Sequence, residues 1–164
     1  MSSGVYEEEY AVNIMETRLI RLSAEEREEA LIISETVGDS STKDKNMLMA
    51  KLGRLMFKAD SFNPLPQDSE IIEYQYDINR SIWKEARELR SSSDLINLGE
   101  NVMCPVVAIH GDYDPHPFEG VRSTLSRIMK DFKFTLLEKC GRYPWVERDA
   151  KDGFYSILRN EIVS

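Results

Sequence analysis

The stretch Cys104-Pro105-Val106-Val107-Ala108-Ile109-His110-Gly111 decides the fold of this chain. It is apolar at successive positions, not at alternate ones, which is typical of a strand covered on both faces in a parallel sheet. Gly111-Asp112-Tyr113-Asp114-Pro115 follows directly, and this run combines turn-forming residues with two carboxylates. The sequence therefore predicts a strand over Pro105–Ile109 that ends in an acidic turn.

A helix and a second strand are expected after this turn. Pro117 suits the first turn of a helix, and the apolar residues that follow recur at helical spacing: Phe118, Val121, Leu125, Ile128 and Met129. Lys133–Glu138 is expected to form the second strand, which leads into Cys140-Gly141-Arg142-Tyr143-Pro144-Trp145. This order predicts a parallel crossover with a loop after each strand, at the edge where open α/β sheets place their functional residues.

These motifs resemble the C-terminal part of an α/β-hydrolase. In that family the acid of the catalytic triad lies in a Gly-x-x-Asp turn after the penultimate strand, and the triad histidine follows the last strand in a Gly-His-x-x-Trp type of sequence. The resemblance places Asp114 at the position of the acid and Arg142 at the position of the histidine. It covers roughly the last half of the chain.

The resemblance also implies an architecture for the whole chain. Residues 1–66 would be a helical lid-like lobe, and residues 67–164 a C-terminal α/β-hydrolase-like segment. The expected fold class is α/β: a truncated α/β-hydrolase-like fold in which the lobe precedes a helix–strand–helix–strand–helix unit with a two-stranded parallel sheet. The nucleophile elbow Gly-x-Ser-x-Gly and the first six strands have no counterpart here, so the chain is expected to begin inside the lid.

The N-terminal lobe is expected to contain three helices. Tyr6–Ile20 carries apolar residues at helical spacing, and Ser23-Ala24-Glu25-Glu26 is a capping box for a second helix that ends near Val37. Gly38–Lys45 is a polar loop, and a third helix is expected over Asn46–Ala59.

The segments on either side of the crossover are also predicted to be mainly helical. Ile71–Ile78 is ambiguous between a short strand and an extended link. Asn79 is expected to cap a helix that fades through Ser91-Ser92-Ser93. A last helix is expected over Asp149–Ile162, with four apolar residues facing inward: Phe154, Ile157, Leu158 and Ile162.

Composition and charge exclude several classes of function. The chain has 164 residues, 41% of them apolar, which is enough to form a folded core, and its net charge of −8 argues against nucleic acid and anionic membranes as partners. It contains no apolar run of membrane-spanning length and no signal-peptide pattern at its start. Cys104 and Cys140 are expected at opposite ends of neighbouring strands, as unbridged thiols of a cytoplasmic protein.

The arginine at position 142 decides the functional interpretation. In a catalytic triad the carboxylate orients an imidazole, and the imidazole accepts the proton of the serine. An arginine side chain stays protonated and cannot act as that base. Asp114 and Arg142 are therefore expected to be vestigial triad positions that form an ion pair across two loops, without catalytic activity.

Other interpretations of the functional side chains remain open. A zinc or manganese site is one, because four potential ligands alternate along the turn: His110, Asp112, Asp114 and His116. Two prolines interrupt this alternation, so no metal or other cofactor is expected. Cys140 and His116 could form a thiol–imidazole pair, although a small buried residue at a strand end is the simpler interpretation of Cys140. Four residues could either line a pocket under the lid or simply pack in the core: Met47, Met49, Met56 and Phe57.

The exposed edge of the first strand predicts association. In the parent fold Pro105–Ile109 lies between two strands, whereas here only Phe134–Leu137 is available as a neighbour. The unpaired edge is expected to pair with a second copy of the chain and form a homodimer. The alternatives are a separate chain that supplies the missing hydrolase half, or a helix that covers the edge.

The function expected from these features is that of an association or binding module with no hydrolase activity on its own. One alternative is half of a split ester or amide hydrolase, completed by a chain that carries the nucleophile serine. A second alternative is a stand-alone enzyme that uses Cys140 or the polar residues between His110 and His116.

Overall fold

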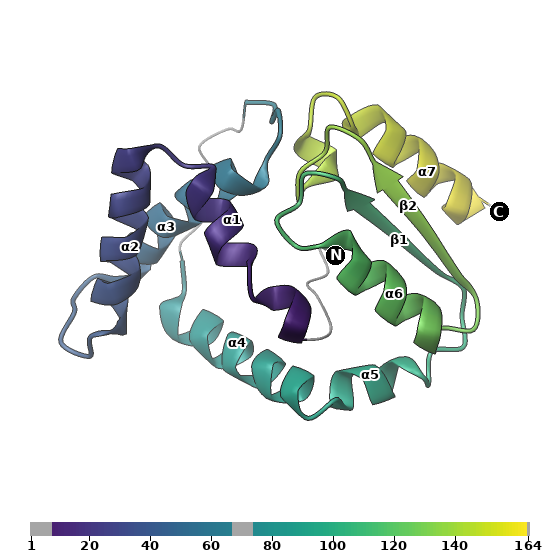
Figure 1. Ribbon diagram of the computed structural model, residues 1–164, viewed down its shortest axis with the longest axis horizontal. Coiled ribbons are helices and arrows are strands. Elements are labelled where there is room, and N and C mark those ends of the chain that lie inside the picture. The colour runs from purple at the N-terminus through teal and green to yellow at the C-terminus, as the bar shows by residue number, and fades with distance from the viewer. Residues whose placement is uncertain (1–7, 67–73, 164) are drawn as a thin grey trace.

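The computed structural model describes residues 8–66 and 74–163, which form a mixed α/β structure (Figure 1). A lobe of helices lies on one side and a two-stranded sheet on the other, and two further helices join them along one edge. The elements are η1 (Glu8–Ala11), α1 (Ile14–Ile20), α2 (Ala24–Gly38), α3 (Lys45–Asp60), α4 (Tyr76–Ser91), α5 (Asp94–Gly99), β1 (Val106–Gly111), α6 (Phe118–Ile128), β2 (Phe132–Leu137), η2 (Pro144–Val146) and α7 (Lys151–Val163), where η1 and η2 are short 3-10 helices.

The helical lobe follows the sequence signals closely. The Ser23 hydroxyl accepts a hydrogen bond from the Glu26 amide at 3.2 Å, and the Glu26 carboxylate accepts one from the Ser23 amide at 3.1 Å, so the predicted capping box is confirmed. α3 begins and ends within one residue of the expected bounds. The core of the lobe is formed by buried residues and their partly buried neighbours from α1 to α3: Leu22, Ala30, Ala59, Leu19, Leu52, Leu55 and Met56.

The first predicted helix is not continuous. The short helix η1 ends at Ala11, and α1 starts at Ile14, after a turn. The Asn13 carbonyl accepts the hydrogen bond that opens α1, from the Thr17 amide at 2.9 Å. Asparagine favours turns and helix starts, so the helix restarts here instead of running on from Tyr6, which lies outside the described residues.

α4 starts earlier than expected, and Asn79 is not its cap. The helix begins at Tyr76, and the Asn79 amide already makes a helical hydrogen bond to the Gln75 carbonyl. The Tyr76 amide donates to the side chain of Asn46, at the start of α3, so a distant contact fixes the helix start. In the ambiguous segment Ile71–Ile78, residues 71–73 lie outside the described part, and residues 76–78 are helical, not strand.

The apolar side chains of α4 remain exposed. No residue of this helix is buried, although its apolar residues lie at helical spacing. Ile78 and Ile82 are each 58% exposed and Trp83 is 50% exposed. Short helix α5, which was not expected from the sequence, continues α4 toward the sheet. Within the described ranges, no helix combines the length and the apolarity that crossing a membrane requires.

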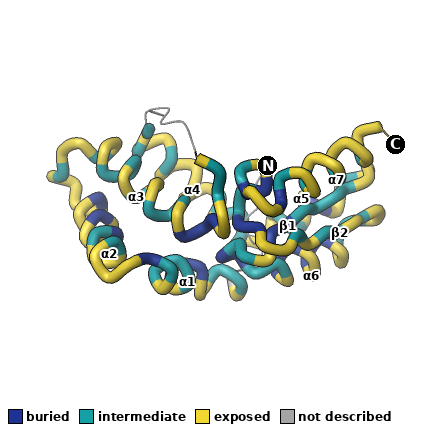
Figure 2. The backbone as a smooth tube through the Cα atoms, turned by 90° about the horizontal axis from the view of Figure 1, so that it is seen from above, coloured by how far each residue is buried: buried dark blue, intermediate teal, exposed yellow. Residues whose placement is uncertain are grey.

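The crossover has the predicted topology. β1 and β2 are parallel, with a register that runs from Val106 opposite Phe132 to Gly111 opposite Leu137. α6 and α7 cover opposite faces of this sheet (Figures 1 and 2). Residues 106–109 are only half-buried, so the expected coverage on both faces is complete only at the end of β1. The other edge of β1 has no strand partner within the described part of the chain.

The last helix packs less completely than expected. Phe154 and Ile157 are half-buried, but Leu158 is 37% exposed and Ile162 is 73% exposed. The expectation that all four apolar residues face inward is therefore wrong for Ile162. A sheet of two strands offers a narrow surface, so the end of α7 has no described layer to pack against.

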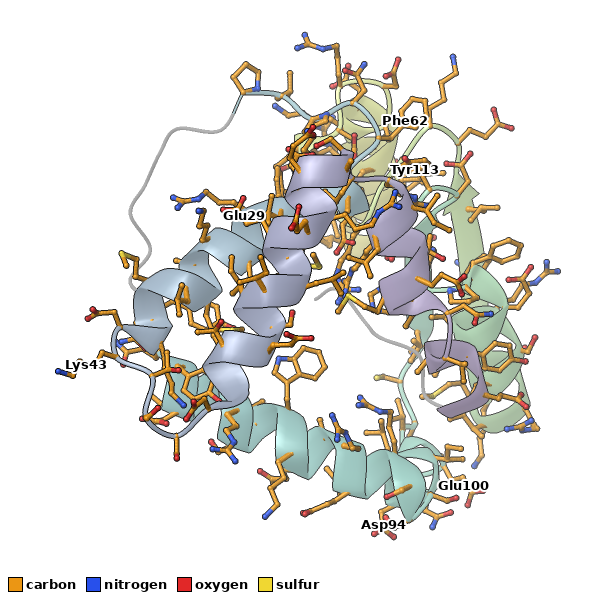
Figure 3. All side chains as sticks on the ribbon, turned by 60° about the vertical axis from the view of Figure 1, so that its left-hand side comes forward. Glu29, Lys43, Phe62, Asp94, Glu100 and Tyr113 are labelled. Carbon is orange, nitrogen blue, oxygen red and sulfur yellow. The ribbon has the colours of Figure 1, made fainter. Side chains whose placement is uncertain are left out.

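The carboxyl ends of both strands face the helical lobe (Figure 1), and a network of main-chain hydrogen bonds joins the two parts. We call this region the junction; it comprises residues 57–65 and residues 140–149. The Asp60 carbonyl accepts from the Arg142 amide at 2.9 Å, and Leu65 donates to Val146 at 2.7 Å. Figure 3 shows Phe62 and Tyr113 next to each other at this place, where their rings meet edge to face at 5.4 Å.

Two buried carboxylates hold the junction together. The Glu147 side chain is fully buried and accepts main-chain hydrogen bonds from Phe62, Asn63 and Gly141 at 2.8–3.0 Å. Asp60 accepts two hydrogen bonds from the Arg18 guanidinium, at 2.6 and 2.7 Å. Gly141 is required here, because a Cβ atom at this position would overlap the Asp60 carbonyl and the Glu147 carboxylate.

Candidate functional site

The two loops after the strands are tied to each other. The Asp114 amide donates to the Gly111 carbonyl at 3.3 Å, which closes the predicted Gly-x-x-Asp turn. The Tyr113 amide donates to the Cys140 carbonyl at 2.8 Å, and the Cys140 amide donates to the Asp112 carboxylate at 3.1 Å. These bonds bring the turn that carries Asp114 against the loop that carries Arg142.

Asp114 accepts two hydrogen bonds from His116, one from the main-chain amide and one from the imidazole. Its Oδ1 atom accepts hydrogen bonds from the His116 amide at 2.9 Å and from His116 Nδ1–H at 2.7 Å. Both side chains are buried, with 6% of Asp114 and 9% of His116 exposed. A side-chain oxygen that accepts the amide two residues further on forms an Asx turn. The carboxylate therefore fixes both the position and the tautomer of the imidazole.

Arg142 contacts the other side of this imidazole. Its Nη1 atom lies 2.8 Å from His116 Nε2 and also contacts Nδ1. Because Nδ1–H donates to Asp114, Nε2 carries the lone pair, and the guanidinium lies against both ring nitrogens. Nη1 lies 3.9 Å from Asp114 Oδ1, so the expected ion pair is present only at its outer limit, and His116 lies between its two members.

Burial and charge keep the imidazole neutral. Burial lowers the pKa of His116, and the adjacent Arg142 guanidinium lowers this pKa further, which outweighs the hydrogen bond to Asp114. Burial opposes ionisation of Asp114, but its hydrogen bonds from His116 outweigh this effect and hold its pKa below the ordinary value. At neutral pH the site thus consists of a carboxylate, a neutral imidazole and a guanidinium, in that order.

The sequence alone does not predict the hydrogen bonds between Asp114 and His116. The sequence pattern suggests His116 only as a metal ligand or as a partner of Cys140. The spacing Asp114-Pro115-His116 was the available signal, because an aspartate readily forms an Asx turn with the amide two residues further on. Proline at the intervening position restricts the backbone and supports that turn.

Cys140 is not an activated thiol. Its side chain is fully buried, and the thiol donates to the Gly141 carbonyl at 3.4 Å. Burial raises the pKa of this thiol to about 12, and the nearby carboxylates of Glu147, Asp112 and Asp114 add to the shift. The interpretation of Cys140 as a small buried residue at a strand end is therefore confirmed. Cys104, before β1, is exposed, and both cysteines are free.

The metal interpretation is not supported by the geometry. His110 donates through Nδ1 to the Gly111 carbonyl at 2.9 Å, and its Nε2 atom lies 3.8 Å from Asp114 Oδ2, buried and without a hydrogen-bond partner. Asp112 is committed to the Cys140 amide. In residues 8–66 and 74–163, no group of three or more His, Cys, Asp or Glu side chains is arranged to hold a metal ion.

A cavity of about 190 Å³ lies beside this cluster. Its polar lining includes Arg142, Asp114 and His110. Its apolar wall comes from β1, from the loop after β2 and from α7: Val107, Ile109, Trp145, Phe154 and Leu158. The cavity thus combines one cation, one carboxylate and one imidazole with an apolar wall.

The residues considered for a lid pocket do not gather at one site. Met56 packs against the core of the lobe, and Phe57 stacks on Tyr143 with ring centroids 5.4 Å apart. Met47 is 65% exposed and lines a separate open groove of about 690 Å³ between the start of α3 and the start of α4. Met56 and Phe57 are therefore packing residues.

No family model matches the chain, and comparisons with curated proteins and with solved structures found no similar protein.

Proposed function

We propose that this protein is an association and binding module with an α/β-hydrolase-like arrangement and no hydrolase activity on its own. The observation that carries the proposal is the position of the Arg142 guanidinium, whose Nη1 lies 2.8 Å from His116 Nε2. In a triad this nitrogen takes the proton of the nucleophile. Here a group that stays protonated lies 2.8 Å from it, so a proton taken up by Nε2 would meet a fixed positive charge, which makes the Asp114–His116 pair a poor base.

The surroundings of the histidines support the same conclusion. Among the described residues, no serine, threonine or cysteine side chain is hydrogen-bonded to His110 or His116. The cysteine nearest in sequence to Arg142 is Cys140, whose pKa of about 12 keeps it protonated. Asp114 and Arg142 are accordingly proposed as vestigial triad positions.

Association is the second part of the proposal. β1 is paired with β2 on one side only, and its half-buried residues Val106–Ile109 lie next to an edge without a described partner. An apolar strand with a free edge favours pairing with another strand. A second copy of β1 would pair antiparallel across a two-fold axis and form a homodimer with a four-stranded sheet. Two free thiols fit a cytoplasmic location for this dimer.

A proline substitution tests the dimer. The amides of Val106 and Asp112 donate toward the β2 side, to Asp131 and Leu137, so by strand alternation the Val107 amide points to the free edge. Val107→Pro should therefore convert a dimer into a monomer with unchanged far-UV circular dichroism, as measured by sedimentation at micromolar concentration. Ala108→Pro is the contrast, because it removes an amide that faces β2 and should unfold the sheet. A monomeric wild-type protein would overturn the dimer.

Ester turnover tests the absence of catalysis. The chain alone should not hydrolyse p-nitrophenyl esters above the buffer rate, and Arg142→His should not restore activity without a nucleophile. Turnover by the chain alone that is lost in Asp114→Ala would overturn the proposal. The free edge of β1 also fits the alternative of a separate chain that carries the nucleophile serine, and turnover only in a mixture with such a chain would identify a split hydrolase.

A further inference from the structure

The Arg142 guanidinium is a largely buried charge that makes only a distant ion pair. Its side chain is 11% exposed. Nη1 contacts a neutral imidazole, and the nearest carboxylate oxygen, Asp114 Oδ1, is 3.9 Å away and already accepts two hydrogen bonds. Nε and Nη2 make no hydrogen bond to the described residues. Buried charges are stable when they are closely paired, so this guanidinium has spare capacity for an anion.

The cavity next to Arg142 limits the size and the character of that anion. Its volume is about 190 Å³, and most of its wall is aliphatic or aromatic. A water molecule occupies roughly 30 Å³, so the cavity holds on the order of six to nine non-hydrogen atoms. A nucleotide or a peptide would not fit wholly inside it. The apolar wall favours a ligand whose body is hydrocarbon.

The charges at the cavity select a monoanion. Of the residues that line it, only Arg142 carries a permanent positive charge. Asp114 lines the same end and is ionised, so a dianion such as phosphate would meet one cation and one fixed negative charge. A cationic ligand would meet Arg142 itself. The planar guanidinium presents parallel N–H donors that match the two oxygens of a carboxylate.

We propose that the cavity binds a short apolar monocarboxylate, with the carboxylate on the Arg142 guanidinium and the hydrocarbon against the wall formed by β1 and α7. This site rests on one part of the proposed function: the protein binds the ligand and does not convert it. It does not depend on the homodimer.

Calorimetric titration of the full chain with sodium hexanoate at pH 7.5 tests the site. We expect saturable binding, and roughly ten- to hundredfold weaker binding by Arg142→Met, because a charged bidentate hydrogen bond is lost. Arg148→Met is the matched control: this exposed arginine does not line the cavity, and its loss should leave binding unchanged. Hexan-1-ol and inorganic phosphate, which lack either the carboxylate or the hydrocarbon, should bind at least about tenfold more weakly.

A second variant keeps the test valid if Arg142→Met does not fold. Leu158→Trp keeps the guanidinium but fills the cavity from α7, where Leu158 is 37% exposed, so the larger ring should be tolerated. It should abolish hexanoate binding without changing far-UV circular dichroism. Undiminished binding by this variant, equal affinity for hexanoate and hexan-1-ol, or no binding by the wild type would each overturn the inference.

The outcomes for the ligand and for the proposed function can be separated. Hexanoate binding by a protein that sediments as a monomer would sustain the ligand site and remove the dimer. Binding together with ester turnover by the chain alone would sustain the site and remove the non-catalytic proposal. A stable dimer that does not bind hexanoate would remove the ligand site only.

Discussion

Two arginine–aspartate pairs lie at or next to the junction, each with a buried carboxylate, and they differ in how closely the two charges approach. Arg18 and Asp60 share two hydrogen bonds of 2.6 and 2.7 Å. Arg142 and Asp114 are 3.9 Å apart, with a neutral imidazole between them and a cavity beside them. In the first pair the guanidinium donates two hydrogen bonds to the carboxylate, whereas in the second the guanidinium donates none to it. The comparison teaches that incomplete pairing, and not the burial of charge, distinguishes a candidate site from a structural ion pair.

The largest expected effect is at the closed junction. Glu147→Leu would remove the acceptor that the amides of Phe62, Asn63 and Gly141 share, in a partly buried place. Each unsatisfied donor costs about 1–3 kcal/mol, so the free energy of unfolding should fall by about 3 kcal/mol or more in urea titration. Asp149→Asn, at an exposed carboxylate nearby, should change it by less than about 0.5 kcal/mol. Similar losses in the two variants would contradict the role given to Glu147.

The two arginines provide the direct test of the comparison. Arg18→Met should lower the free energy of unfolding by about 3–5 kcal/mol, because it leaves the buried Asp60 carboxylate without its partner. Arg142→Met should change it by no more than about 1 kcal/mol, because Asp114 keeps both hydrogen bonds from His116. Urea unfolding at pH 7.5 measures both variants. Equal losses would show that the two pairs are equally structural.

The smallest expected effect is a pH dependence that arises from His116. Its pKa in the folded protein lies below the value of about 6.5 for an unfolded chain, so unfolding takes up a proton at low pH. The free energy of unfolding should therefore decrease as the pH falls below about 6.5, with a contribution of at most about 1.4 kcal/mol per pH unit.

His116→Asn should flatten this dependence between pH 7.5 and pH 5, as measured by urea titration at several pH values. Asp114 also has a lowered pKa, but its stabilising contribution is lost only near and below its ordinary value of about 3.9, outside that range. An unchanged slope in His116→Asn would show that the acid sensitivity comes from another group.

The elements that local sequence determines were the predictable ones. Ser23 and Glu26 are three residues apart and cap α2 without help from the rest of the chain. β1, α6 and β2 follow from apolar runs and spacing, and their parallel pairing follows from the helix between them. The turn that holds Asp114 is closed by Gly111, three residues before it. In each case the interacting residues are close in sequence, so the local sequence is sufficient to predict the structure.

The features that could not be predicted depend on distant partners. The start of α4 is set by Asn46, 30 residues before Tyr76, which overrides the local signal at Asn79. The role of Glu147 has no signal in the sequence. Its carboxylate binds main-chain amides, and almost any residue at those positions would provide the same amide. At the site, the sequence predicts that Asp114 and Arg142 face each other across two loops, but the imidazole between them and the cavity beside them require the packed loops.

The junction has a consequence for the folding kinetics of the chain. Glu147 binds amides that are 84 and 85 residues away, and Arg21 reaches the Tyr113 carbonyl across 92 residues. Contacts of such sequence separation require a long loop to close, whereas the helices of the lobe and the β1–α6–β2 unit form from nearby residues. The junction should therefore be assembled after the transition state, so that its weakening accelerates unfolding while the rate of refolding stays nearly constant.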